Sequence, residues 1–584
     1  MMIKKLMESI REYKKDSILA PVYVVFESVL EVIIPTLMAY LIDYGIYKKD
    51  MSVIYKLGAV LIICSGLSLL AGFLAGRSAS IAAAGFAKNL RRDMYYAVQN
   101  FSFSNIDRFS TASIVTRLTT DVTNVQNAYM MILRAVFRSP FIMIFALIMA
   151  FRIDGGIAFI FLIIIPVLGF GLIFIASYVH PTFKRVFKTY DKLNNVVQEN
   201  LRGMRVVKSF TREGFEEKKF GSVSDLIYRD FSKAEKILAF NAPLMQFCVY
   251  AAMILISWLG AKAIVASNNN PAVGLSTGDL TGLITYTMQI LMSLMMLSMV
   301  FVMIIVSRAS VERIVEVLNE KSDLKNGENP VYTVKDGAVT FENVTFAYAR
   351  KSDKPVLQNV SVSIAAGETV GILGGTGSSK SSFVQLIPRL YDVVGGKITV
   401  GGIDVREYDI ESLRNQVAMV LQKNVLFSGT IKDNLRWGNE NATDEEMIQA
   451  CQAAQADGFI REFPEKYDTY IEQGGTNVSG GQKQRLCIAR ALLKKPKILI
   501  LDDSTSAVDT KTDALIRKAF REQLPDTTKI IIAQRVTSVQ DADKIIIMDD
   551  GKISAAGTHE ELLETNSIYR EVYESQNKGK AIHE

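Results

Sequence analysis

Long apolar stretches, separated by polar segments of which some are short and two are long, fill the chain up to about residue 310. Six stretches reach the roughly 20 residues that a helix needs to cross a bilayer, and we expect spans at about 17–45, 53–80, 129–151, 156–180, 238–265 and 278–307. The second stretch continues from Tyr55 to Gln99 without a proline. At about 1.5 Å per residue such a helix extends about 70 Å, over twice the hydrocarbon thickness. We therefore expect helices that continue beyond the membrane as cytoplasmic stalks.

The pattern changes after a polar, glycine-containing segment at residues 321–336. From there, short β-rich runs alternate with helical patterns, which is typical of an α/β domain. The chain is therefore predicted to be multidomain, with an all-α six-helix transmembrane domain at 1–320 and an α/β domain at 321–584.

Composition and charge also favour a membrane protein. Hydrophobic residues make up 49% and charged residues 22% of the 584 positions, a balance that soluble enzymes rarely have. The net charge of +6 is small for this length and gives no reason to expect nucleic-acid binding. Lysine and arginine are frequent in 87–128 and 181–237 but absent from Ser267–Asp279. By the positive-inside rule, we expect a multi-pass cell-membrane protein, surrounded by membrane lipids, with both basic segments and the α/β domain in the cytoplasm.

Two acidic residues stand inside the first span. Glu27 and Glu31 are four residues apart and therefore share one helix face. Carboxylates inside a membrane are costly and usually face a cavity or a partner, so the pair is a candidate attractant for a cationic substrate. Alternatively, the pair lies near the cytoplasmic end of the span, wetted or paired with a basic side chain. Both interpretations stay open at this point.

A stripe of methionines follows one face of the sixth span. Its members, at spacings of 4, 3, 4 and 4, are Met288, Met292, Met295, Met299 and Met303. Flexible thioethers suit a substrate cavity that adapts to many apolar ligands, and Gln289 beside the stripe would add a polar contact. Helix packing or lipid contact explains most such stripes and is the competing interpretation.

The α/β part contains a glycine-rich phosphate loop. The apolar run Thr369–Leu373 leads into it, and a helix is expected from about Lys380, so that backbone N–H groups and a helix N-terminus surround an anion. Lys380 would reach the β- and γ-phosphates of ATP, and Ser381 would ligate Mg²⁺. Ser379 stands where the pattern has glycine, and a side chain there adds strain of about 1 kcal/mol or reshapes the loop. The predicted ATP-binding residues of this loop are Gly374, Gly375, Thr376, Gly377, Ser378, Ser379, Lys380, Ser381 and Ser382.

Two further motifs follow the phosphate loop. The segment Val478–Gln482 reads Val-Ser-Gly-Gly-Gln, and the apolar run Lys497–Leu501 ends at Asp502, a predicted ligand of Mg²⁺. In this order the motifs resemble those of the half-transporters of the ABC exporter family, and the resemblance covers essentially the whole chain. It implies an ABC-type nucleotide-binding domain in which further residues have assigned roles. These are Tyr348, which stacks on adenine, Gln422, which senses the γ-phosphate and the membrane domain and ligates Mg²⁺, and Ser506–Asp509, a loop with Asp509 that crosses a dimer interface.

The resemblance breaks down at the positions that perform hydrolysis. Family members have a glutamate base directly after the magnesium aspartate and a histidine further on, where this chain has Asp503 and Gln534. Aspartate is one methylene shorter, and a displacement of about 1 Å can cost about 100-fold in rate. Glutamine is unable to carry a proton's charge as histidine does. We therefore expect slow or absent turnover at this chain's own site.

A second chain is required by the same resemblance. In the family each ATP lies between the phosphate loop of one nucleotide domain and the signature motif of another, and this chain has one such domain without an internal repeat. We expect a heterodimer with a partner half-transporter that has the Glu and His. The signature residues that would complete the partner's site are Ser479, Gly480, Gly481 and Gln482.

The expected function is ATP-driven export of amphipathic, cationic compounds, as in bacterial multidrug transporters. Short helices near Ser104–Thr116 and Arg202–Glu213 would dock on the nucleotide domains, by the same resemblance. A dedicated exporter or flippase for a lipid or peptide, or an importer on this scaffold, would use the same machinery. A purely regulatory, non-hydrolysing subunit is a further alternative. A homodimer is disfavoured because both of its sites would lack the Glu and His.

Overall fold

The chain divides by packing into two compact units. The first contains Met1–Gln99 and Ser110–Glu320, and the second contains Lys321–Glu584 together with the short segment Asn100–Phe109. The computed structural model describes residues 2–267, 269, 274–348, 354–504 and 508–578.

The first unit is built from helices, and it has the six membrane spans that the apolar pattern predicted. Among the described residues, six helical runs are long and apolar enough to cross a membrane: Met2–Ile46, Met51–Gln99, Thr111–Ile153, Gly155–Arg202, Glu213–Ser267 and Thr277–Asn319. The helices within them are α1 (Met2–Met7), α2 (Lys14–Tyr40), α3 (Met51–Gln99), α5 (Thr111–Thr116), α6 (Val122–Met131), α7 (Phe137–Ile153), α8 (Gly155–Arg202), α10 (Glu213–Leu238), α11 (Asn241–Ser267) and α12 (Thr277–Asn319). The short helix α9 (Met204–Ser209) lies between the fourth and fifth runs.

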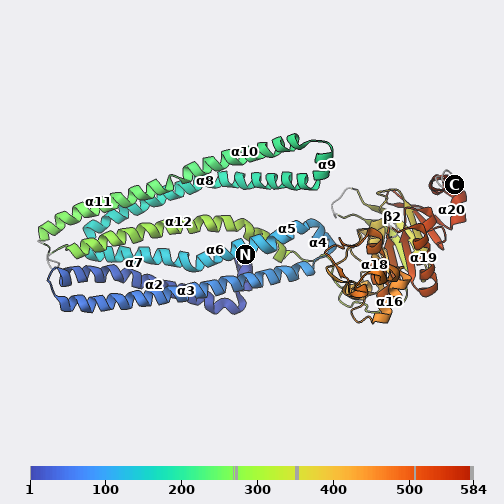
Figure 1. Cartoon of the computed structure of the whole chain (residues 1–584), viewed down its shortest axis with the longest axis horizontal. Coiled ribbons are helices and arrows are strands. Elements are labelled where there is room, and N and C mark those ends of the chain that lie inside the picture. Colours follow the sequence, from blue (N-terminus) through green and yellow to red (C-terminus); the bar gives the residue numbers. More distant parts are fainter. Residues whose placement is uncertain (1, 268, 270–273, 349–353, 505–507, 579–584) are drawn as a thin grey trace. The chain divides into compact units, whose positions relative to one another are not determined.

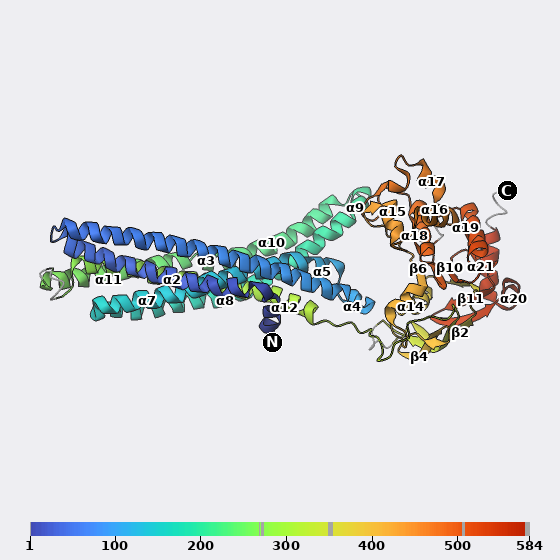
Figure 2. The same ribbon diagram turned by 90° about the horizontal axis from the view of Figure 1, so that it is seen from below.

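Long helices run side by side in this unit (Figures 1 and 2). Helix α2 lies along α3, α8 lies along α10, and α12 lies along both α7 and α2. Helices α3, α8 and α12 have 49, 48 and 43 residues. At about 1.5 Å per residue each is more than 60 Å long, so each continues well past the roughly 30 Å hydrocarbon layer as the sequence predicted.

Short helices occupy the two segments where the resemblance placed them. Helix α4 (Phe103–Arg108) and α5 lie in the first segment, and α9 lies in the second. Helix α4 lies within the segment Asn100–Phe109 and starts with a capping box, in which the Ser102 side chain accepts from the backbone N–H of Asn105. This segment belongs to the second unit, and one of its contacts there is with Tyr391, whose hydroxyl donates to Asp107 Oδ2 at 2.7 Å.

The second unit is centred on a six-stranded sheet with the order β12-β11-β3-β10-β9-β6. All neighbours pair in parallel except β11 and β12. Alternate residues of one strand belong to different apolar clusters, since Leu499 and Leu501 pack in one and Ile498 and Ile500 in the other. Successive side chains point to opposite faces of a strand, so both faces of the sheet are covered, as is usual for parallel sheets.

The remaining elements of the second unit surround this sheet. A four-stranded antiparallel sheet has the order β2-β1-β4-β5, and β7 pairs with β8. The strands are β1 (Val339–Phe346), β2 (Leu357–Ile364), β3 (Thr369–Gly374), β4 (Gly395–Val400), β5 (Ile403–Asp404), β6 (Val417–Val420), β7 (Gly429–Thr430), β8 (Tyr470–Ile471), β9 (Ile498–Asp502), β10 (Thr528–Ile532), β11 (Lys544–Asp549) and β12 (Lys552–Gly557). The helices are α13 (Lys380–Gln385), α14 (Ile410–Gln416), α15 (Ile431–Arg436), α16 (Asp444–Ala453), α17 (Asp457–Glu462), α18 (Gly480–Leu493), α19 (Thr510–Gln523), α20 (His559–Thr565) and α21 (Ser567–Lys578).

Candidate functional site

Four neighbouring parallel strands deliver the predicted nucleotide-site residues to one edge of the sheet. Strands β6, β9, β10 and β3 are adjacent, and Ile532 pairs with both Asp502 and Ile372. Parallel strands end at the same edge, so the segments that follow them meet there. Gln422 follows β6, Asp503 follows β9, Gln534 follows β10 and the phosphate loop follows β3.

The phosphate loop closes around the side chain of Lys380. The Lys380 Nζ donates to the carbonyl oxygens of Gly374 and Gly375, both at 2.8 Å, and to Ser378 Oγ at 3.1 Å. Burial lowers the pKa of Lys380, and the carboxylates of Asp502 and Asp503 oppose that effect. Gly377 has φ +85°, in the left-handed region that favours glycine. The loop therefore presents a cation and backbone groups to the same small volume, which fits the phosphates of ATP.

Ser379 adopts a conformation that glycine normally provides. Its φ and ψ are 70° and 20°, in the left-handed region, and it directly precedes helix α13. The loop thus has a backbone conformation that suits glycine at this position, and the Cβ of Ser379 makes that conformation strained.

Two of the three predicted magnesium ligands, Ser381 and Asp502, lie within hydrogen-bonding distance of each other. A hydrogen bond from Ser381 and the charge of Lys380 lower the pKa of Asp502, but burial has the larger effect and raises it overall. Asp502 is buried at the end of β9, where every residue is buried. One hydroxyl and one carboxylate are the protein oxygens that a Mg²⁺ ion needs when phosphates and water supply its other ligands.

The residues at the two predicted catalytic positions, Asp503 and Gln534, are in direct contact. Gln534 Nε2 donates to Asp503 Oδ2 at 2.7 Å, and Gln422 Nε2 lies 3.5 Å from the same oxygen. The Asp503 backbone has φ 49° and its N–H donates to the carbonyl oxygen of Ile532. The arrangement holds a carboxylate between two amide donors, neither of which can carry a proton's charge.

The aromatic residue expected to stack on adenine lies close to helix α13. Tyr348 is exposed, and its hydroxyl is 2.9 Å from Ser382 Oγ on the first turn of α13. The ring of Tyr391 meets the ring of Tyr348 edge-on, with centroids 5.1 Å apart. An exposed aromatic face beside the phosphate loop is suited to stacking on a purine base.

The signature motif forms the start of helix α18. The Ser479 side chain accepts from the backbone N–H of Gln482, and the Gln482 side chain accepts from the N–H of Ser479, so the pair forms a capping box. Ser479 and Gly480 are exposed and Gly481 is half-buried. The positive end of a 14-residue helix is therefore accessible to an anion from outside the chain.

The dimer-crossing loop is described only in part. Ser506 and Ala507 lie outside the described residues. Asp509 is exposed and caps α19, because its carboxylate accepts from the backbone N–H and the hydroxyl of Thr512 at 2.9 and 2.7 Å. These hydrogen bonds lower the pKa of Asp509.

In the membrane unit, Glu27 and Glu31 share one arginine. Arg138 on α7 donates to Glu27 Oε1 at 3.0 Å and to Glu31 Oε1 at 2.6 Å, while Gln289 on α12 donates to the backbone carbonyl of Glu31 at 3.1 Å. The structure thus has the pairing with a basic side chain that was one of the two interpretations. Arg138 was not among the predicted site residues, although an arginine inside the apolar span 129–151 signals that it needs a partner.

The methionine stripe is open to its surroundings in the single chain. Met288, Met292, Met295 and Met299 are all exposed, with Met292 and Met299 more than 60% exposed. Within the part of the chain that the structure describes, the stripe therefore lies outside the packed interior of the helices, and packing within one chain does not explain it.

Comparisons with known proteins decide the family. The ABC transporter transmembrane region matches residues 17–295, and the ABC transporter family matches residues 357–506. YfiB, an uncharacterised ABC transporter ATP-binding protein of Bacillus subtilis (strain 168), is 35% identical over 574 residues, covering 98% of each chain. The chain belongs to the ABC transporter family. It is an exporter-type half-transporter with one membrane domain and one ATP-binding domain, and it is a multi-pass membrane protein whose architecture implies a dimer partner.

Other relatives of this ABC half-transporter extend the comparison. An ATP-dependent lipid A-core flippase of Desulfotalea psychrophila is 31% identical over 490 residues, covering 84% of each chain. Among solved structures, a bacterial Atm1-family ABC exporter with ATP bound has a TM-score of 0.82 and 24% identity, covering 97% of this chain and 99% of its own. That structure supports the fold alone, whereas the matched ATP-binding domain implies that the half-transporter binds ATP.

Proposed function

We propose that this half-transporter is the degenerate-site subunit of a heterodimeric exporter. The observation that carries the proposal is the contact between Asp503 and Gln534 at the two positions where hydrolysis needs Glu and His. A shortened carboxylate held by an amide retains a hydrogen-bonding network for the γ-phosphate without an efficient base. General-base catalysis contributes about 10²–10⁴-fold, so ATP at this site is held rather than turned over.

Hydrolysis then takes place at the site that the partner subunit completes. The capping box at Ser479 and the exposed Gly480 leave the start of α18 intact and accessible, which supports this division of roles. ATP and Mg²⁺ bound by Lys380, Ser381 and Asp502 would fix this chain's half of the closed dimer. Lys380 would neutralise part of the phosphate charge, and Ser381, Asp502 and Gln422 would hold Mg²⁺, which would supply further positive charge to the phosphates.

Two substitutions on this chain test the division. In the complex purified through a tag on this chain, Asp503→Ala should leave most of the ATPase activity, because that residue is not the working base. Ser479→Ala should remove most of it, by about 10-fold or more, because the signature acts on the partner's ATP. Thr558→Ala is the matched control, since Thr558 caps α20 with the same kind of capping box.

Both threonine and serine caps are worth about 1 kcal/mol of stability, so the two cap variants should lose similar stability while only Ser479→Ala loses activity. Equal loss of activity in Asp503→Ala and Ser479→Ala would contradict the proposal.

For the substrate, we propose amphipathic, cationic compounds. Two carboxylates and one guanidinium leave the cluster of Glu27, Glu31 and Arg138 with one excess negative charge inside the membrane unit. Glu31 and Arg138 are partly exposed, at 28% and 34% of their side chains, so the cluster is within reach of a ligand. The exposed methionines on α12 supply an adaptable apolar surface on the helix that also contributes Gln289.

A lipid substrate is the second candidate, and it is favoured by the relatives named as lipid A-core flippases. Drug-stimulated ATPase activity of the complex separates the two. Organic cations should stimulate the native complex, and Glu31→Gln should weaken that stimulation about 10-fold by removing the excess charge. Stimulation by lipid alone, unchanged in Glu31→Gln, would favour the lipid substrate.

A further inference from the structure

The C-terminal helix α21 holds the backbone directly after Gln534, on both sides of Arg535. Gln576 Nε2 donates to the carbonyl oxygen of Gln534 at 2.9 Å, and Gln576 Oε1 accepts from the N–H of Val536 at 2.9 Å. One side-chain amide thus satisfies a backbone acceptor and a backbone donor two residues apart, as a neighbouring strand would. Gln534 and Val536 lie just beyond β10, where sheet pairing no longer fixes the chain.

Helix α21 is itself firmly anchored, so its amide is a fixed reference. Tyr569 is 1% exposed and packs in the apolar cluster that covers one face of the six-stranded sheet. Its hydroxyl is 2.5 Å from His559 Nδ1 on α20, and its backbone N–H donates to Asn566 Oδ1 at 2.9 Å. Gln576 lies about two turns further along the same helix, at about 3.6 residues per turn.

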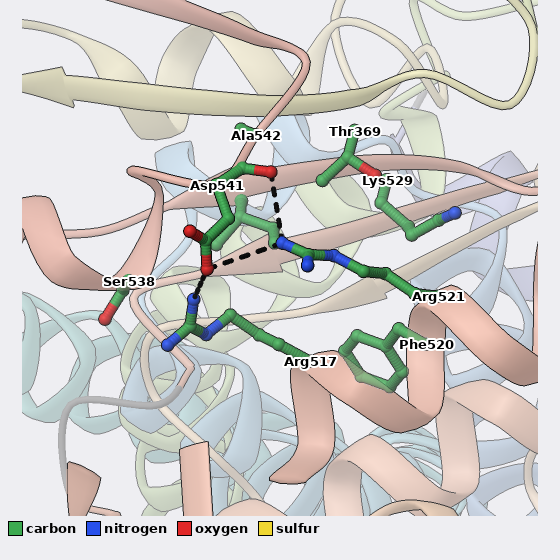
Figure 3. Close-up of a pocket in the computed structure, with 9 residues that line it drawn as sticks. Thr369, Arg517, Phe520, Arg521, Lys529, Ser538, Asp541 and Ala542 are labelled. Atoms are coloured by element: carbon green, nitrogen blue, oxygen red, sulfur yellow. Dashed lines mark hydrogen bonds and ion pairs between the residues drawn. The ribbon is translucent and has the colours of Figure 1, made fainter. Parts of the chain in front are cut away.

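The far end of the same segment is held by helix α19 (Figure 3). Ser538 Oγ donates to Asp513 Oδ2 at 3.2 Å. The Asp541 carboxylate forms ion pairs with Arg517 and Arg521 at 3.2 and 3.4 Å, as Figure 3 shows. Residues 534–541 are therefore attached to α21 at one end and to α19 at the other. The Ala533 N–H and the buried side chain of Val536 hold the backbone on either side of Gln534, and Gln576 binds the Gln534 carbonyl itself.

We propose that Gln576 is a positioning residue for Gln534, and that α21 thereby sets how long this chain's site holds ATP. The side chain of Gln534 reaches Asp503 Oδ2 at 2.7 Å, and its direction follows from the backbone that Gln576 fixes. This inference rests on the proposed function, in which the site retains ATP. Loss of the Gln576 amide would let the backbone of 534–536 move, and the hydrogen bond from Gln534 to Asp503 would loosen with it.

The test uses the tagged complex and two variants of Gln576. Gln576→Ala removes both hydrogen bonds, and Gln576→Glu keeps the acceptor for Val536 but turns the donor facing Gln534 into an acceptor. Ser575→Ala, an exposed neighbour on the same helix, is the matched control. Radiolabelled ATP is bound and chased with unlabelled ATP, and retention in Lys380→Ala is subtracted as the part that does not belong to this chain's phosphate loop.

Gln576→Glu should shorten the lifetime of the retained nucleotide by about five-fold, the effect of one lost hydrogen bond, and Gln576→Ala, which loses both, should shorten it by at least as much. Hydrogen exchange at the Val536 amide should rise by about the same factor in Gln576→Ala, while exchange in β9 stays unchanged and reports intact folding. In a Gln534→Ala background, Gln576→Ala should have no further effect on the lifetime, because it acts through Gln534. Ser575→Ala should match the native complex.

Three results would overturn the inference: faster exchange at Val536 with an unchanged lifetime, an equal effect in the Gln534→Ala background, or raised exchange in β9. The chemical identity of the released nucleotide tests the proposed function separately. Release as ATP supports a degenerate site, whereas release as ADP overturns that function and leaves the lifetime comparison for Gln576 valid.

Discussion

At the residue scale, Ser379 stores strain in the phosphate loop. A non-glycine residue in the left-handed region costs about 1 kcal/mol or more, and Ser379 has φ 70°. The same backbone path is free of that cost when the residue is glycine. The strain is present in every state in which the loop keeps this backbone conformation. It lowers the affinity for ATP to the extent that the ATP-bound loop must keep this conformation and the free loop need not.

Ser379→Gly should therefore tighten ATP binding by up to about five-fold, which corresponds to about 1 kcal/mol. Equilibrium binding of ATP to the full chain measures this. Thr376→Gly is the matched control, because Thr376 is exposed in the same loop and its φ lies outside the left-handed region. That change should weaken binding or leave it the same. Tighter binding in Thr376→Gly alone would show that loop flexibility, not relief of strain, controls affinity.

The degenerate catalytic pair gives a second prediction at this scale. The double variant Asp503→Glu and Gln534→His should raise turnover at this chain's site by about 10²-fold, since it restores a base and a group that carries charge. Each single change should achieve much less, because the two side chains are in contact and their effects are coupled.

Turnover of this site is isolated by measuring the double variant in a Ser479→Ala background, where the partner's site is silenced. ATPase activity that stays at the level of Ser479→Ala alone would mean that other features, such as Ser379, already prevent hydrolysis.

At the scale of elements, the cluster of Glu27, Glu31 and Arg138 joins α2 to α7, with α12 attached through Gln289. Removing one partner of a fully buried ion pair costs about 3–5 kcal/mol, and we expect less here because about a third of the Arg138 side chain is exposed. Arg138→Met should therefore lower the melting temperature of the full chain. Arg134→Met is the matched control, because Arg134 is exposed one turn earlier and should change stability by less than about 0.5 kcal/mol.

The triple variant Glu27→Gln, Glu31→Gln and Arg138→Met should recover much of the lost stability, since it leaves no unpaired charge. A melting temperature that falls equally in Arg138→Met and Arg134→Met would mean that the cluster does not hold α2 to α7.

The sequence predicted elements better than it predicted contacts. Helix α3 could be extended to Gln99 because no proline interrupts it, and the strand before the phosphate loop was predicted because its apolar run ends in glycine. The short helices α4, α5 and α9 followed from the resemblance. The structure has all of these elements. Helix α3 and the strand could be predicted because they depend on local sequence.

Contacts between distant segments could not be predicted from local patterns. Arg138 meets Glu27 across 111 positions and Gln576 meets Gln534 across 42. Asp503 and Gln534 were predicted to fail together, but their direct hydrogen bond depends on β9 and β10 lying side by side in the sheet. Such contacts are fixed by strand order and helix packing, which a single sequence does not specify.

At the scale of the whole molecule, one membrane domain and one ATP-binding domain make half of a transporter. A site that binds ATP between a phosphate loop and a signature motif is complete only when a second chain supplies the missing half. This chain has an exposed helix start at Ser479 and Gly480, and it has Asp503 and Gln534 at the positions where we propose that hydrolysis is impaired. The central claim is therefore that its partner is a different chain with the Glu and His.

Intact-mass spectrometry of the complex captured by a tag on this chain from its native membranes tests that claim most directly. We expect one copy of this chain with one copy of a second ABC half-transporter whose sequence has Glu and His at the catalytic positions. Recovery of this chain paired only with itself would refute the heterodimer and would make Asp503 the working base of a homodimeric exporter.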